Sequence, residues 1–229
     1  MDFSTSQIIF ENRRDAGRQL AAKLTEYNEK SVVVLAIPNG GVPVALEVAS
    51  ALKADLDVVV SRKIPMPLSP EGGFGAVADN GTIILNEHEV KRLGLSQQQI
   101  EYEARKVREK VKQRSMLYKG DRPLTKLSGR TVIVVDDGLA SGVTMIAAVE
   151  SVRHRGCREI VVAVPVASAT AYDLIKPLTD ELVCLVIAHT YGFAVASFYH
   201  HWYDLSDEEV IKYLEDWRTK HTETGAERP

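Results

Sequence analysis

An apolar run that ends in two adjacent carboxylates is the part of the sequence whose residue types and spacing most clearly suggest chemistry. Residues 131–135 are followed by Asp136 and Asp137, and mostly small residues fill positions 138–144. Neighbouring carboxylates repel each other, so a fold keeps such a pair only where something uses both. Small side chains let backbone N–H groups close on an anion, and the start of a following helix adds positive potential. The pattern therefore predicts a sugar-phosphate site, with the phosphate in the loop and vicinal ribose hydroxyls on the two acids.

The predicted phosphate loop consists of Gly138, Leu139, Ala140, Ser141, Gly142, Val143 and Thr144. Ser141 and Thr144 add hydroxyl donors to the backbone N–H groups of this loop. The alternative is an ordinary strand-to-helix turn in which the two acids are accidental.

Buried strands alternate with helices along most of the chain. Strands are predicted at 32–37, 57–60, 131–135, 160–164 and 182–187, and helices at 15–24, 42–52, 143–156 and 167–175. This alternation predicts an α/β fold with an open, doubly wound, mainly parallel sheet. Ligands of such sheets bind at the carboxyl ends of the strands. Three segments that interrupt the apolar pattern with turn-forming, small or charged residues are predicted to lie there: 38–41, 61–75 and 136–144.

The middle of the chain, residues 64–118, differs in character from the rest. Prolines and glycines crowd residues 64–75, which predicts a mobile loop that could act as a lid. Residues 76–85 predict a small hairpin that turns at 79–81. Ser96 is predicted to cap a long helix that ends near Tyr118.

This long helix is strongly basic, with Arg105, Lys106, Arg108, Lys110, Lys112 and Arg114. The favoured interpretation is a solvated face that pairs in part with acidic residues of the same helix. The alternative is an electrostatic funnel for an anionic ligand or RNA.

The overall composition is that of a globular protein in a reducing compartment. The 229 residues are 45% hydrophobic and carry a formal net charge of −3. This charge does not favour nonspecific electrostatic binding to nucleic acid. Cys157 and Cys184 lie in apolar segments far apart, which indicates core residues rather than a disulfide or metal framework. No apolar run approaches the ~20 residues that span a bilayer, and the first residues lack a basic-then-apolar leader pattern. We therefore expect a cytoplasmic protein that does not bind membranes.

Residues 132–144 resemble the phosphoribosyl-diphosphate (PRPP) binding motif of type I phosphoribosyltransferases. That motif has four apolar residues, two acids and a small-residue loop ending in Thr/Ser-Gly-x-Thr, and this sequence matches each place. The order of elements also fits, so the resemblance covers residues 8 to 215, and residues 10–17 are similar to a bacterial branch of the family. One phosphoribosyltransferase domain is expected over 1–217, followed by a polar tail at 218–229.

The resemblance implies a Mg²⁺-dependent enzyme that displaces pyrophosphate from PRPP with a nitrogen of a nucleobase or a related compound. Residues 138–144 would hold the ribose 5-phosphate. The catalytic pair, Asp136 and Asp137, would contact the ribose hydroxyls and stabilise positive charge on the sugar ring. No dedicated metal cage is implied, because Mg²⁺ binds mainly through substrate oxygens and could reach these two carboxylates.

Relatives hold pyrophosphate in a loop after the first core strand, which places Asn39, Gly40 and Gly41 at the site. That loop often carries a non-proline cis peptide in the family. Arg62 and Lys63 end the next predicted strand at the same edge, where relatives have a basic residue that pairs with diphosphate oxygens. The alternatives are a plain turn at 38–41 and a surface charge pair at Arg62 and Lys63.

The acceptor base is left open by the resemblance. Bases normally stack in a hood outside the sheet, and the aromatic residues within 189–205 are the candidates, namely Phe193, Tyr199 and Trp202. A packed C-terminal aromatic cluster is the competing interpretation. Ala140 stands where some 6-oxopurine members carry an aspartate, which disfavours a hypoxanthine–guanine type without assigning another.

Two further expectations concern partners and metal. A homodimer is expected, since relatives are commonly dimers. His200 and His201 are adjacent but lack a third predicted ligand, so they are weak evidence for a metal site.

The second functional hypothesis is a non-catalytic sensor of PRPP or a nucleotide that regulates nucleic acid or a protein partner through another face. The basic helix at 105–114 is the feature that could serve it. The near-neutral overall charge argues against nucleic-acid binding.

Overall fold

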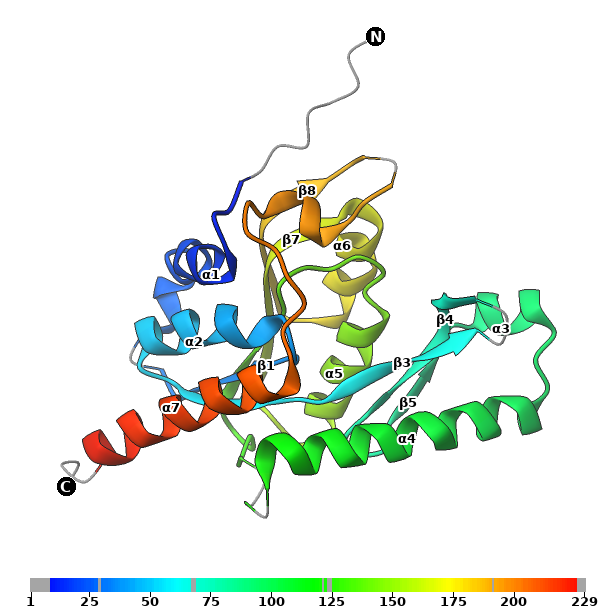
Figure 1. The fold of residues 1–229 in the computed structure, drawn as a ribbon, viewed down its shortest axis with the longest axis horizontal. Coiled ribbons are helices and arrows are strands. Elements are labelled where there is room, and N and C mark those ends of the chain that lie inside the picture. The colour runs from blue at the N-terminus through cyan, green and yellow to red at the C-terminus, as the bar shows by residue number, and fades with distance from the viewer. Residues whose placement is uncertain are drawn as a thin grey trace, which may run out of the picture.

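A five-stranded parallel sheet forms the centre of the molecule (Figure 1). The computed structural model describes residues 9–28, 30–66, 69–120, 122, 125–190 and 192–225. The strands are β1 (Val32–Ala36), β2 (Asp55–Val58), β6 (Thr131–Val135), β7 (Glu159–Ser168) and β8 (Glu181–Ala188), in the order β2-β1-β6-β7-β8. All four pairings are parallel, which confirms the predicted sheet.

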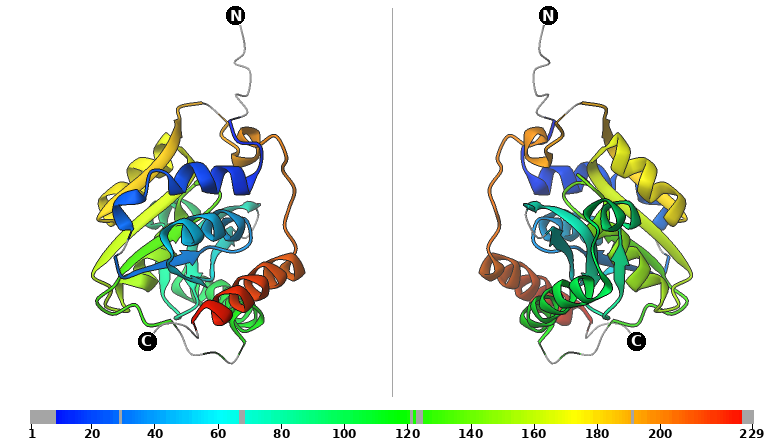
Figure 2. Two further views of the ribbon diagram at one scale, coloured as in Figure 1. Left: turned by 90° about the vertical axis from the view of Figure 1, so that its left-hand side faces the viewer. Right: turned by 90° about the vertical axis from the view of Figure 1, so that its right-hand side faces the viewer.

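Helices cover both faces of this sheet, as a doubly wound fold requires (Figures 1 and 2). Helices α1 (Arg13–Ala21) and α2 (Gly41–Leu52) lie on one face, and α5 (Val143–Arg153) and α6 (Ala169–Ile175) lie on the other. Successive strand residues point to opposite faces. Accordingly Val34 packs with the α2 side, whereas Leu35 packs with the α5 side. Strands buried on both faces read as continuous apolar runs, which is why the sequence revealed them.

A three-stranded antiparallel sheet forms an arm beside the main sheet, with α4 along it (Figure 1). It consists of β3 (Ser61–Met66), β4 (Ser69–Ala78) and β5 (Ile83–Leu85), and it is followed by α3 (Glu87–Leu93) and α4 (Gln97–Lys119). The predicted hairpin at 76–85 is confirmed by the pairing of β4 with β5. The Ser96 cap is confirmed as a capping box with Gln99.

The prediction of a loop over residues 64–75 is wrong, because most of this segment forms β3 and β4. The two strands pair with register shifts at Ile64/Pro65 and Pro65/Met66. Such irregularities let a strand carry proline, which cannot donate to a regular ladder. Pro67 and Leu68 lie outside the described residues. The expected lid is therefore the end of a β-arm.

Short 3₁₀ turns and a long C-terminal helix complete the fold. The turns are η1 (Thr25–Tyr27), η2 (Lys176–Leu178) and η3 (Val195–Phe198), and the helix is α7 (Asp207–Gly225). Residues 218–225 of the predicted polar tail continue this helix, and 226–229 lies outside the described residues. Within the described part, no helix combines the length and apolarity needed to cross a bilayer.

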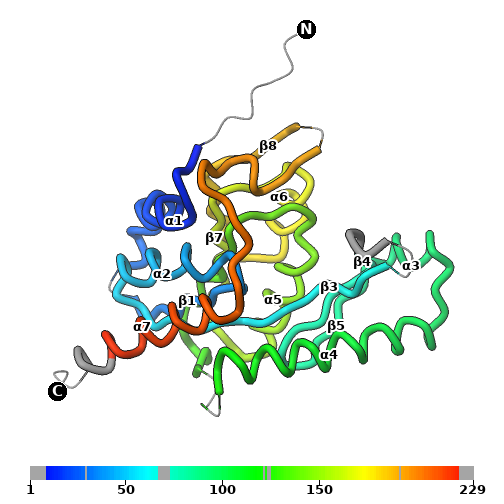
Figure 3. Tube along the Cα trace, in the orientation of Figure 1, coloured from blue at the N-terminus to red at the C-terminus, as the bar shows by residue number. Residues whose placement is uncertain are grey.

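The segment before α1 and the segment before α7 meet beside the main sheet (Figure 3). Phe10 and Tyr199 form a parallel bridge, and both side chains are buried. Their rings lie 5.3 Å apart at the centroids. The segment that precedes α1 is therefore fixed against the segment that precedes α7.

Candidate active site

A cleft of about 500 Å³ opens at the carboxyl ends of β1 and β6. It is lined by residues from all three predicted segments: Asn39 and Gly40, Arg62 and Lys63, and the 136–142 stretch with Thr144. Strand β1 delivers the first segment, β6 the third, and the start of β3 the second. The structure thus brings together loops that are far apart in the sequence, at the edge where ligands of parallel sheets bind.

The two acids at the end of β6 form the floor of the cleft. The backbone N–H of Asp137 donates to Oδ1 of Asp136 at 2.8 Å. Burial raises the pKa of Asp136 well above its usual range, and the negative charge of Asp137 raises it further. Burial also raises the pKa of Asp137, against the opposing effect of Arg13. Ionisation of this acid pair is disfavoured in the free protein. A cation or a ligand hydroxyl bound beside the two carboxylates would favour their ionised form.

Arg13 is the residue of this site that sequence reasoning missed. Its Nε donates to Oδ2 of Asp137 at 2.8 Å, and an NH1 hydrogen bond of 2.8 Å reaches the backbone oxygen of Tyr203. The guanidinium lies 3.8 Å from the ring centroid of Trp202. Arg13 is only 7% exposed, so this is a buried ion pair. Its position 124 residues before Asp137 left no spacing signal, although it falls within the 10–17 segment that carried part of the family resemblance.

The loop after β1 lies directly against the acids. Its Pro38–Asn39 peptide bond is cis, as the resemblance implied. A Cβ on Gly40 would lie 1.8 Å from Oδ2 of Asp137, and one on Gly41 would lie 2.7 Å from the Val135 oxygen. Both glycines are therefore needed for close approach. Gly40 lines the cleft, whereas Gly41 is buried against β6 and does not line it, so the contact of Gly41 with pyrophosphate stays a prediction.

Asn39 lines the cleft, and its side chain also has hydrogen-bond partners on other elements. Its side-chain amide donates to the Leu205 oxygen at 2.7 Å and to Asp207, and its side-chain oxygen accepts from Arg114 at 2.9 Å and from Tyr118 at 2.8 Å. The side chain thus ties the loop to α4 and to the start of α7. Pro38, Asn39 and Gly40 all line the cleft.

Arg114 adds a third cation to the cleft beside Arg62 and Lys63. It comes from the last turns of the basic helix α4, and the funnel interpretation of that helix stays a hypothesis. Its NH2 donates to Oδ1 of Asp207 at 2.5 Å. This hydrogen bond lowers the pKa of Asp207 to about 2.

We expect Asp207→Asn to destabilise the protein mainly above pH 4. A carboxyl whose pKa is depressed by folding stabilises the folded state above its unfolded pKa of about 4 and loses that contribution as the pH falls toward about 2. The Asp207 side chain is 34% exposed, so solvent screening reduces the expected loss at pH 7 to about 1 kcal/mol. Urea denaturation at pH 7 and at pH 3 measures it. Asp204→Asn, at a neighbouring exposed position, is the control, and equal losses in both variants would contradict the assignment.

The predicted phosphate loop is held by its own backbone. The Leu139 N–H donates to the Val166 oxygen, and the Ser168 N–H donates to the Leu139 oxygen. Gly142, with φ of +75°, precedes the first turn of α5, so a residue with a side chain would be strained there. Ser141 and Thr144 line the cleft, as predicted.

Two residues of this loop also pack into the protein. Leu139 lines the cleft and is buried in the core on the α5 side of the sheet. Val143 packs toward Ala76, Ala78 and Ala147, where α5 meets the arm. Val143 is not among the residues that line the cleft, and its contact with the phosphate stays a prediction.

The predicted base hood is not assembled as expected. Tyr199 is buried between Phe10 and Trp202, with its hydroxyl donating to the Asp137 backbone oxygen at 2.6 Å. Trp202 covers Arg13, and Phe193 packs with Phe198. None of the three predicted residues lines the cleft, whereas Val195 from η3 does. The competing interpretation, a packed aromatic cluster, fits this arrangement.

Comparison with known proteins agrees with the fold. The family model of the phosphoribosyl transferase domain matches residues 6–197. Two proteins from strains of Mycobacterium tuberculosis, whose names assign them provisionally to the phosphoribosyl transferases, are 38% identical over 218 residues. That match takes in 95% of this chain but 49% of each relative, so the chain spans about half the length of the curated relatives it matches.

A solved structure is similar over nearly the whole chain. The crystal structure of the protein TT1426 from Thermus thermophilus has a TM-score of 0.78 and 38% sequence identity, and the match covers 91% of this chain and 99% of that one. The cleft lies between β1 and β6, where the order of strands in the doubly wound sheet reverses. The chain belongs to the phosphoribosyl transferase domain family, which confirms the resemblance of residues 132–144.

Proposed function

We propose that this protein transfers the 5-phosphoribosyl group of PRPP to a ring nitrogen of a nucleobase or a related compound and releases pyrophosphate. The observation that carries the proposal is the composition of one cleft. Asp136 and Asp137 lie beside a small-residue loop at the start of a helix, and three cations face them. A volume of about 500 Å³ is within the range of small-molecule sites.

Each part of the donor has a chemically suited neighbour. The 5-phosphate fits the loop at 138–144, where backbone N–H groups and the hydroxyls of Ser141 and Thr144 are donors. The diphosphate fits the side formed by the 38–40 loop, where Arg62 and Arg114 provide positive charge. The ribose then lies over the acid pair.

The transfer breaks the bond between the anomeric carbon and the pyrophosphate oxygen and forms a carbon–nitrogen bond. Pyrophosphate leaves with the electron pair, so positive charge develops on the sugar ring. The carboxylates of Asp136 and Asp137 stabilise that charge as it forms, and Arg13 orients Asp137 and favours its ionised form against the effect of burial. The acceptor nitrogen passes its proton to the departing pyrophosphate or to water as the new bond forms.

The side chains that line the cleft fit Mg²⁺. Its carboxylates are hard oxygen donors, and neither histidine nor cysteine is among the residues that line it. Asp136 and Asp137 would hold the ion together with substrate oxygens. When bound, Mg²⁺ would neutralise charge on the departing diphosphate.

A test of this proposal measures pyrophosphate release. Purified protein is incubated with PRPP, Mg²⁺ and a panel of purine and pyrimidine bases, with the Asp136→Asn variant as a control for contaminating activity. We expect release with at least one base, and none in its absence above slow hydrolysis. PRPP binding without release for any base would contradict catalysis and favour the sensor hypothesis. The predicted homodimer is tested by the mass of the protein in solution.

We expect Thr144→Val to weaken PRPP binding about 10- to 100-fold. The substitution preserves shape and removes one hydroxyl donor to the phosphate, and a hydrogen bond to a charged group contributes roughly 1.5–3 kcal/mol. Titration calorimetry of the variant against the unmodified protein measures the change. Thr179→Val is the matched control, because Thr179 precedes β8 at the opposite edge of the sheet. Equal affinity in Thr144→Val and the unmodified protein would contradict the assignment of the loop.

A further inference from the structure

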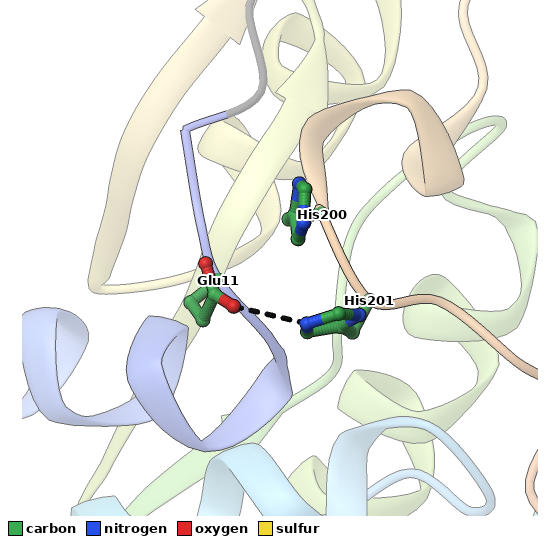
Figure 4. A group of neighbouring side chains, drawn as sticks. All are labelled: Glu11, His200 and His201. Atoms are coloured by element: carbon green, nitrogen blue, oxygen red, sulfur yellow. Dashed lines mark ion pairs between the residues drawn. The ribbon is translucent and has the colours of Figure 1, made fainter.

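A second cluster of ligand-type side chains lies outside the cleft, where the two ends of the fold meet. Glu11, His200 and His201 each offer one ligand atom, and these atoms all lie within 4.8 Å of one another (Figure 4). Oε1 of Glu11 is 3.0 Å from Nε2 of His201, and the two imidazole ring centroids are 4.5 Å apart. The structure therefore supplies the third ligand that the pair of histidines lacked in the sequence.

Backbone hydrogen bonds hold the two segments that carry this cluster against each other. The His200 N–H donates to the Phe10 oxygen at 2.8 Å, and the His201 N–H donates to the Glu11 oxygen at 2.9 Å. Next to them the buried rings of Phe10 and Tyr199 pack together. Since the backbone carrying all three ligands is already fixed, little chain entropy remains to be lost when an ion binds.

We propose that Glu11, His200 and His201 bind a first-row divalent transition metal of the Zn²⁺ type. Two imidazole nitrogens and one carboxylate oxygen, with a fourth position left to water, are a common ligand set for Zn²⁺. Mg²⁺ takes oxygen ligands and does not compete at such a site. The side chains of Glu11 and His201 are 60% and 65% exposed, so both are free to turn toward an ion and shorten the present span of ligand atoms.

A metal here would clamp the segment before α1 to the segment before α7. Arg13 follows Glu11 by two residues, and Trp202 follows His201 directly. These two contact each other at 3.8 Å, and Arg13 in turn holds Asp137. The ion would thus stabilise the contact between these two segments, which supports the acid pair, without lining the cleft. This role is independent of the proposed transferase activity.

The test is a Zn²⁺ titration in competition with a chromophoric chelator, on tag-free protein stripped of metal, in excess Mg²⁺. We expect one tight Zn²⁺ per chain. His201→Ala should weaken binding by about 100-fold or more, since loss of an outer-shell partner alone typically costs 10- to 100-fold. His88→Ala is the matched control, because His88 lies 3.4 Å from Glu89 as an exposed imidazole–carboxylate pair without a second histidine in contact. Its affinity should equal that of the unmodified protein.

A second measurement separates the metal site from folding defects and from catalysis. Zn²⁺ should raise the melting temperature of the unmodified protein and of His88→Ala but not that of His201→Ala. The three proteins should melt alike without metal, because both histidines are exposed. Equal Zn²⁺ affinity in His201→Ala and the unmodified protein, or no tight site in the unmodified protein, would overturn the proposal. Neither readout depends on turnover, so failure here leaves the transferase assignment untouched.

Discussion

Asp136→Asn is expected to lower kcat about 10²- to 10³-fold while leaving the folded protein at least as stable at pH 7. Loss of one preorganised electrostatic group at a charge-developing transition state typically costs that much. Asparagine keeps the shape and the side-chain oxygen that accepts from the Asp137 N–H. The variant is measured by steady-state pyrophosphate release and by urea denaturation.

The stability of this variant follows from the raised pKa of Asp136. A carboxyl whose pKa is higher in the folded than in the unfolded state lowers stability as the pH rises above about 4, because the folded state holds the proton more tightly. Asparagine cannot ionise, so the free energy of unfolding should fall less between pH 5 and pH 8 in the variant. A variant that loses stability as severely as activity would contradict this account and assign Asp136 a structural role.

Asp137→Asn is a less selective probe, although the sequence alone presents the two acids as equivalent. Only Asp137 is paired with the buried guanidinium of Arg13. Removal of its charge leaves that cation without its anion, so stability and activity should fall together. The contrast between the two variants is itself a test of the geometry.

Arg13→Gln is expected to lower the melting temperature by roughly 10 °C. Removal of one partner from a buried pair typically costs about 3–5 kcal/mol, and about 1 kcal/mol shifts the melting temperature of a chain of this size by about 2–4 °C. The Arg13 and Asp137 side chains are only 8% and 14% exposed, so solvent screens this pair weakly. Differential scanning calorimetry measures the shift.

Arg13→Gln should also change the pH profile, which a purely structural residue would not do. Arg13 lowers the pKa of Asp137, so its loss raises that pKa and moves the acid limb of kcat/KM to higher pH. Arg14→Gln is the matched control, because Arg14 is half exposed and pairs with Glu47 at the surface. A surface pair contributes about 0–1 kcal/mol. Arg13→Gln and Arg14→Gln melting at the same temperature would contradict a supporting role for Arg13.

The main sheet could be predicted from the sequence because its central strands are buried on both faces. Residues 32–36 and 131–135 are uninterrupted apolar runs that end in turn-forming or charged residues, and both form strands at those positions. The same logic placed 38–41 and 136–144 at one edge of the sheet. The local pattern of apolar residues was sufficient to predict these strands, because both are fully buried and their connections are short.

The arm and the supporting contacts could not be predicted in this way. Pro65 and the glycines near it suppress any strand signal, yet β3 and β4 pair there with an irregular register. Arg13 with Asp137, and Arg114 with Asn39 and Asp207, join elements that are distant in sequence. No spacing rule relates such residues, because their proximity is a product of the whole fold. Tyr199 shows the converse, since an aromatic-rich segment indicates packing and base stacking equally well.

Titration calorimetry of PRPP into the protein with Mg²⁺ tests directly whether the cleft at the ends of β1 and β6 holds PRPP. We expect one binding event per chain, weakened in Thr144→Val and unchanged in Thr179→Val. The absence of any binding heat from the unmodified, folded protein, with a fresh PRPP sample that a known phosphoribosyltransferase consumes, would contradict it.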